Sequence, residues 1–168
     1  MRPMVPSAST RATLQFLVAA AAGMWLYYCL VVVLNGFLAA IAVPQAYFDW
    51  FRRPRVELAL AILHLAQALP VFVLVGAGVL ATCRLLKAGT WPVLAAILFG
   101  MASYFLYSVV DFLAYEPANL PLGAVPYPKS ARIEQLLHLP WWSVPTFAAP
   151  WLGFGVAAWL LLRNQRDA

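Results

Sequence analysis

Residues 57–82 read ELALAILHLAQALPVFVLVGAGVLAT, a run whose single charged side chain is the glutamate at its start. A helix rises about 1.5 Å per residue and the hydrocarbon core of a bilayer is about 30 Å thick, so about 20 apolar residues are needed to cross it. The run exceeds that length, and besides the glutamate its one titratable side chain is a histidine. It therefore predicts a transmembrane helix.

Three further stretches have the same character, at roughly 14–43, 91–113 and 143–162. Of the 168 residues, 64% are hydrophobic and 10% are charged. A soluble domain carries about 25% charged residues, so this chain has too little polar surface to dissolve alone. We expect an all-α integral membrane protein, a four-transmembrane-helix bundle that forms a single membrane domain over residues 1–168.

The link at 114–142 is long and rich in proline. Within it, Ile133, Leu136 and Leu137 recur at helical spacing over residues 130–139, with polar residues between them. This pattern predicts a short amphipathic helix that lies in the interface plane before the last span.

The net charge of +5 is not gathered into a basic, aromatic-rich motif, so nucleic acid is not indicated as a partner. Lys and Arg residues in short loops tend to stay cytoplasmic. If both termini are inside, the six inner cations are Arg2, Arg11, Arg84, Lys87, Arg163 and Arg166, and the five outer ones are Arg52, Arg53, Arg55, Lys129 and Arg132. We expect an integral protein of a bacterial-type inner (plasma) membrane with cytoplasmic termini, surrounded by membrane lipids and associated with a membrane-protein partner or a second copy.

Polar side chains in the second and third stretches fall on single helix faces. Glu57, His64 and Gln67 lie within about 80° of one another at 100° per residue. The third stretch repeats the arrangement with spacings of four and three residues. The predicted ligand-binding pocket, in the outer half of the membrane, consists of Asn35, Glu57, His64, Gln67, Tyr104, Ser108 and Asp111.

Two interpretations of these polar stripes stay open. Histidine changes charge near neutral pH, and Asp111 lies near a helix C-terminus, where the helix dipole disfavours negative charge. Such groups suit proton exchange, cation binding or metal ligation in a pocket. Alternatively, they form interhelical hydrogen bonds, each worth about 0.6 kcal/mol.

Catalytic and cofactor signals are weak. The candidate metal or haem ligands (His64, His138, Asp111 and Glu116) have no close spacing, whereas a metal site needs three or four ligands. The serines lie in no GxSxG context. The sequence therefore predicts no catalytic residues, no metal and no identifiable cofactor.

Small residues recur four positions apart, which allows close helix contact. The pairs are Ala19/Gly23, Gly36/Ala40, Ala77/Ala81 and Ala96/Gly100. We expect them to serve ordinary packing within the molecule.

Three functions are compatible with these patterns. The favoured one is an accessory, assembly or scaffold subunit, because the chain is small and lacks a catalytic motif. The second is a small transporter or ligand-binding protein that uses the outer pocket with His64 and Asp111. The third is a membrane-embedded enzyme acting on a lipid or quinone, with Asp111, Glu116 and His138 as acid–base groups.

Overall fold

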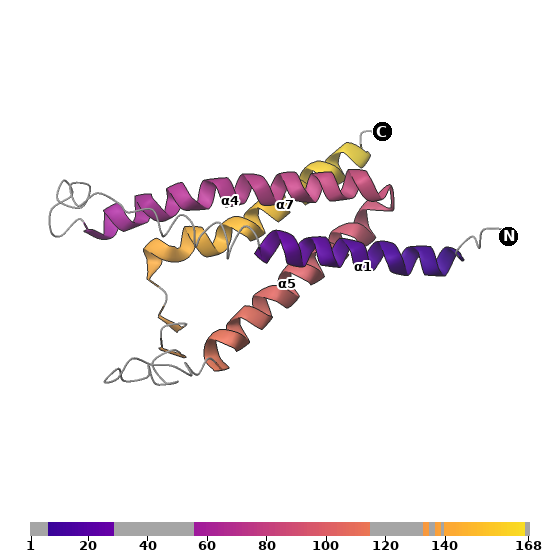
Figure 1. Ribbon diagram of the computed structural model, residues 1–168. Helices are drawn as coiled ribbons and strands as arrows, with labels where there is room; N and C mark the ends of the chain where they lie inside the picture. Colours follow the sequence, from indigo (N-terminus) through magenta and orange to yellow (C-terminus); the bar gives the residue numbers. More distant parts are fainter. Residues whose placement is uncertain (1–6, 29–55, 115–132, 135–136, 139, 167–168) are drawn as a thin grey trace.

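The computed structural model describes residues 7–28, 56–114, 133–134, 137–138 and 140–166. Its elements are α1 (Ala8–Tyr27), α4 (Val56–Leu86), α5 (Thr90–Ala114), the short 3-10 helix η2 (Trp141–Ser143) and α7 (Val144–Arg166), as Figure 1 shows. The described residues contain helices and no strand, so the all-α prediction is confirmed.

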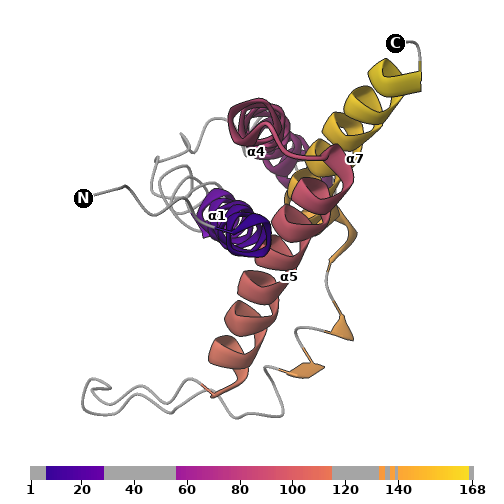
Figure 2. The same cartoon turned by 90° about the vertical axis from the view of Figure 1, so that its right-hand side faces the viewer.

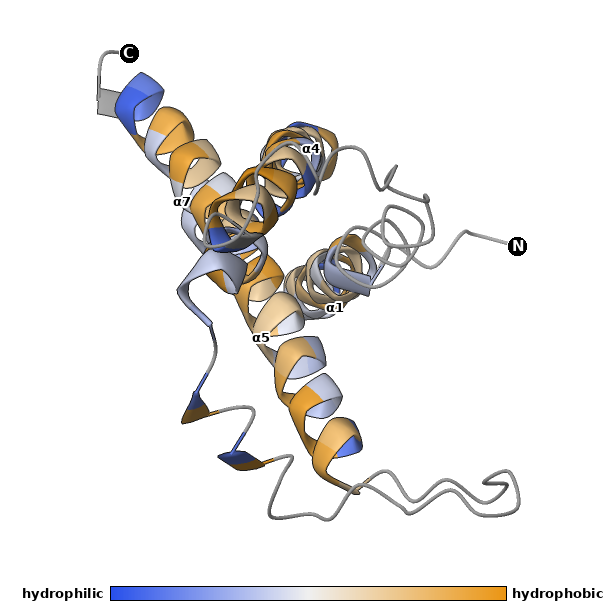
Figure 3. Ribbon diagram, turned by 90° about the vertical axis from the view of Figure 1, so that its left-hand side faces the viewer, coloured by the Kyte–Doolittle hydropathy of each residue, from blue (hydrophilic) through white to orange (hydrophobic). Residues whose placement is uncertain are grey.

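Three of these helices are long and apolar enough to cross a membrane: Glu57–Leu86, Thr90–Ala114 and Trp141–Gln165. They contain the predicted runs 57–82, 91–113 and 143–162. Figure 3 shows hydrophobic residues along the helices and hydrophilic ones near the C-terminal ends of α5 and α7. Exposed apolar side chains on α4, such as Leu65, Leu69 and Val73, are those expected of a lipid-facing surface. The chain is a membrane protein.

The first predicted span is not confirmed, because α1 is not among these three helices, which were found within the described residues. The described helix begins in a polar segment that includes Arg11 and Gln15, and it ends at Tyr27. The rest of the predicted run 14–43 lies outside the described residues. A bundle of four spans therefore stays a prediction.

The predicted interfacial helix 130–139 falls mostly outside the described residues. Among those described, the His138 amide donates to the Glu134 carbonyl oxygen over 2.9 Å. These residues are four positions apart, the separation of a hydrogen bond in an α-helix. The helix as a whole stays a prediction.

The four long helices pack mainly as two pairs, α1 with α5 and α4 with α7. Figures 1 and 2 show α5 crossing α1 and then diverging from α4 toward its own C-terminal end. Although a short link joins α4 to α5, α4 packs mainly with α7 and α5 mainly with α1.

Small residues bring the backbones of α1 and α5 into direct contact. Gly23 and Gly100 are buried at the crossing. A methyl group on Gly23 would overlap the carbonyl oxygen of Ile97, and one on Gly100 would overlap that of Ala20. Two of the expected small pairs, Ala19/Gly23 and Ala96/Gly100, thus lie at an internal helix contact.

The α4–α7 contact uses a small-residue pattern that the sequence analysis missed. Ala149, Gly153 and Ala157 are buried at four-residue spacing on α7. A methyl group on Gly153 would overlap the carbonyl oxygen of Phe72 on α4. By contrast, the expected pair Ala77/Ala81 is exposed.

Candidate functional site

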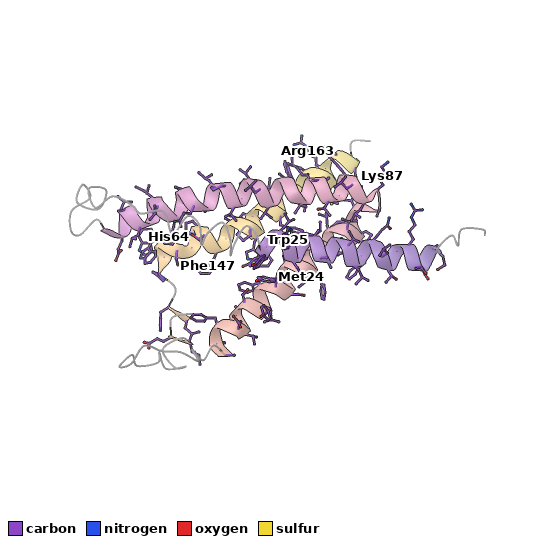
Figure 4. All side chains as sticks on the ribbon, viewed as in Figure 1. Met24, Trp25, His64, Lys87, Phe147 and Arg163 are labelled. Carbon is purple, nitrogen blue, oxygen red and sulfur yellow. The ribbon has the colours of Figure 1, made fainter. Side chains whose placement is uncertain are left out.

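The imidazole of His64 faces the first turn of α7. Its Nδ1 lies 2.8 Å from Oγ1 of Thr146, at hydrogen-bonding distance. The ring also lies against Trp142, with the two ring centroids 5.0 Å apart. All three side chains are half-buried. Figure 4 places His64 beside the turn of α7 that carries the labelled Phe147.

The α4 stripe makes a second bond to the same part of the chain. Nε1 of Trp141 donates to Oε2 of Glu57 over 3.2 Å, and both side chains are exposed. Gln67, three residues after His64, is half-buried. The segment that begins the last span therefore contacts two members of the polar face of α4, Glu57 and His64.

In the α5 stripe, Tyr104 lies against residues of α1 and its C-cap. The ring of Tyr104 lies 6.1 Å from that of Tyr27 and 5.6 Å from that of Tyr28, centroid to centroid. Oγ of Ser108 donates to the Tyr104 carbonyl oxygen over 2.9 Å, a bond within α5 itself. Asp111 is exposed near the end of the helix.

The predicted pocket residues thus fall into two groups, each with different neighbours. Glu57 and His64 contact the segment that begins α7, whereas Tyr104 contacts α1. Figures 1 and 2 agree that the C-terminal end of α5 lies apart from the N-terminal end of α4. Asn35 lies outside the described residues, and ligand binding by any of the seven stays a prediction.

Within the described segments, no group of three or more His, Cys, Asp or Glu side chains could hold a metal ion. Of the candidate ligands, Glu116 lies outside those segments. Cys83, a free thiol, is half-buried at the end of α4, and Cys29 is not described.

The sequence analysis also missed an aromatic cluster around Tyr27. This side chain is 3% exposed, and the rings of Tyr104, Phe105 and Trp151 lie 5.7–6.2 Å from it, centroid to centroid. Because Trp151 belongs to α7, the cluster joins the two helix pairs. The sequence did contain a signal for this cluster. Two adjacent aromatic residues, Tyr27 and Tyr28, follow the small residues of α1.

No family model matches this chain, and no curated protein or solved structure matches it. The functional argument therefore rests on the residues of the chain itself.

Proposed function

We propose that this chain is an accessory, assembly or scaffold subunit that packs against a membrane-protein partner. The observation that carries the proposal is how its polar side chains are used. His64 bonds to Thr146, Glu57 accepts from Trp141, and Gln165 donates to Thr90. Each bond joins two elements of the chain. These polar groups therefore stabilise the fold, as expected of a subunit with a structural role.

The C-terminal half of α5, which diverges from α4, supports the proposal of a partner. Leu106, Tyr107 and Val110 are 62%, 61% and 54% exposed on this half. Both views show it extending away from α4 and α7 (Figures 1 and 2). An aromatic and apolar face that no described helix covers on that side suits docking of another membrane helix, from a partner or a second copy.

Charge distribution supports an orientation. The described cationic side chains, Arg11, Arg84, Lys87 and Arg163, lie where α1 begins and where α4 and α7 end. The rule that positive residues stay inside favours a cytoplasmic location for this end. We propose a bacterial-type inner membrane, cytoplasmic termini, and a fourth span formed by α1 with the residues after it.

Site-specific photocrosslinking tests the accessory role. A benzophenone amino acid replaces Leu106 on α5 in one variant and the equally exposed Val73 on α4 in the control, which is 57% exposed. We expect a stoichiometric protein adduct, identified by mass spectrometry, at position 106 and not at 73. A lone monomer that crosslinks only lipid from both positions would overturn the proposal.

Reporter fusions test the orientation separately. A fluorescent protein that folds only in the cytoplasm should be active at either terminus, and a phosphatase active only outside should be inactive there. The opposite pattern would reverse the topology.

A ligand-binding or transport role is the second candidate. Its support is the half-buried His64 beside Trp142. It also requires Asp111, whose helix packs mainly with α1. If a candidate ligand stabilises the protein, His64→Ala and Asp111→Asn should each abolish that effect, and unchanged stabilisation in both would exclude this role. The enzyme alternative finds no support in the contacts of the described residues.

A further inference from the structure

A groove lies between the N-terminal part of α1 and the connection from α4 to α5, with a volume of about 490 Å³. Arg11, Gln15 and Lys87 supply its polar lining, and Phe16, Pro92 and Val93 are among its apolar residues. It lies at the end of α4 opposite Glu57 and His64. None of its residues belongs to the predicted pocket.

The charge around the groove is entirely positive among the described side chains. Arg84 and Arg163 lie at the same end as Lys87, and Figure 4 labels Lys87 and Arg163 there. The described acids, Glu57, Asp111 and Glu134, belong to the first turn of α4, the last turns of α5 and the link before η2. An anion in the groove would therefore meet two cations and no described carboxylate.

Two local features hold the cations on either side of the groove. Nε2 of Gln15 donates to the carbonyl oxygen of Leu86 over 3.2 Å, which ties α1 to the last residue of α4. Arg11 lies one turn before Gln15 on the same face of α1, and Lys87 directly follows Leu86. Lys87 has a φ of 45°, in the left-handed backbone region that residues other than glycine rarely adopt.

We propose that this groove binds the phosphate group of an anionic phospholipid. A guanidinium presents a planar fork of donors that matches phosphate oxygens, and an ammonium adds a compact charge. Arg11 precedes the apolar run of α1 and Lys87 follows that of α4, which puts both cations at the depth of the headgroups. The neighbouring Phe16 and Val93 offer contact to the first part of an acyl chain. Basic pockets between helices are typical sites for acidic headgroups.

This site goes beyond the proposed accessory role and does not depend on it. The source of the phosphate is a lipid and not a free ion, because the groove continues from its cations onto apolar residues of α1 and of the membrane-spanning helix α5.

Lipid binding is measured on the full chain in mild detergent, by native mass spectrometry and by thermal stabilisation, as phosphatidylglycerol or phosphatidylcholine is titrated. The test variants are Arg11→Gln, Lys87→Asn and the double variant, and asparagine is chosen because it tolerates a left-handed backbone. The control is Arg163→Gln, which removes a cation at the same end that stacks on Trp159 and does not line the groove.

We expect the wild type to bind phosphatidylglycerol more tightly than phosphatidylcholine. Each single groove variant should bind phosphatidylglycerol about fivefold more weakly, and the double variant about 25-fold more weakly, because each cation contributes about 1 kcal/mol. Lys87→Arg, which keeps the positive charge, should bind phosphatidylglycerol as the wild type does, in contrast to Lys87→Asn. Unchanged affinity in the double variant, an equal loss in Arg163→Gln, or displacement of the lipid by equimolar inorganic phosphate would each overturn the proposal. Circular dichroism and gel filtration of every variant identify misfolded ones, and the Lys87→Arg rescue keeps the test decisive.

Discussion

Nδ1 of His64 and Oγ1 of Thr146 lie 2.8 Å apart and join the N-terminal half of α4 to the first turn of α7. The bond connects residues 82 positions apart in the chain. Both side chains are half-buried on helices long and apolar enough to cross a membrane, where water is scarce, so each gains from a protein partner. This relationship makes His64 a link between helices and predicts a coupling energy between His64 and Thr146.

A double-mutant cycle with Thr146→Val and His64→Phe should give that coupling energy. We expect about 0.6 kcal/mol, the average for such bonds between membrane helices. The measurement is reversible unfolding in mixed micelles of the wild type, both single variants and the double variant.

Thr82→Val is the matched control for this cycle. Its hydroxyl donates to the Gly78 carbonyl oxygen over 2.8 Å, inside α4. Its effect should therefore add to that of His64→Phe without coupling. A cycle energy at Thr146 no larger than that at Thr82 would contradict the interhelical bond.

Gly153→Ala should weaken the α4–α7 contact, because the added methyl group overlaps the Phe72 carbonyl oxygen and the backbones must separate. Overpacking of this kind costs about 1–3 kcal/mol. Gly155→Ala, two residues further along α7, meets nothing within 4 Å and should leave the free energy of unfolding unchanged or slightly raised. Equal losses in the two variants would contradict the α4–α7 contact as the cause, because helix propensity alone would raise stability at both positions.

Gly100→Ala should destabilise the α1–α5 crossing by a similar amount, about 1–3 kcal/mol, because the methyl group meets the Ala20 carbonyl oxygen. Gly78→Ala provides the comparison, since its methyl group meets only the side chain of Leu26, which can rotate away. Thermal denaturation in detergent should show a clear drop in the midpoint for Gly100→Ala and little change for Gly78→Ala. The reverse order would mean that this crossing is looser than described.

Lys87→Gly should stabilise the fold when no anionic lipid is present. The left-handed backbone at Lys87 strains a residue with a Cβ, and glycine removes that strain at the cost of a more flexible unfolded chain. The expected net gain is about 0.5–1 kcal/mol. Ala88→Gly, at the next position, should lose stability, because the entropic cost and the loss of a packed methyl group apply there without relief of strain. A loss in both variants would contradict the strained conformation.

The candidate site could be predicted only in part. Helical periodicity grouped Glu57 with His64 on one face of α4, and both contact the segment that begins α7. It also grouped Tyr104 with Ser108 on one face of α5. It also led to the expectation of one shared pocket, whereas the described contacts give these faces to different neighbours. A period of 100° per residue places a side chain around its own helix axis and contains no information about which helix covers that face.

By itself, the sequence determined that this protein has membrane helices and approximately where three of them lie. A spanning segment must satisfy its backbone hydrogen bonds internally over the thickness of the bilayer, so an apolar run such as 57–82 has little choice but a helix. Only the tertiary structure decided the pairing of α1 with α5 and of α4 with α7. That choice depends on where two backbones can approach, and small-residue spacing alone did not identify the place: Ala77/Ala81 is exposed, whereas Gly153 is buried against Phe72.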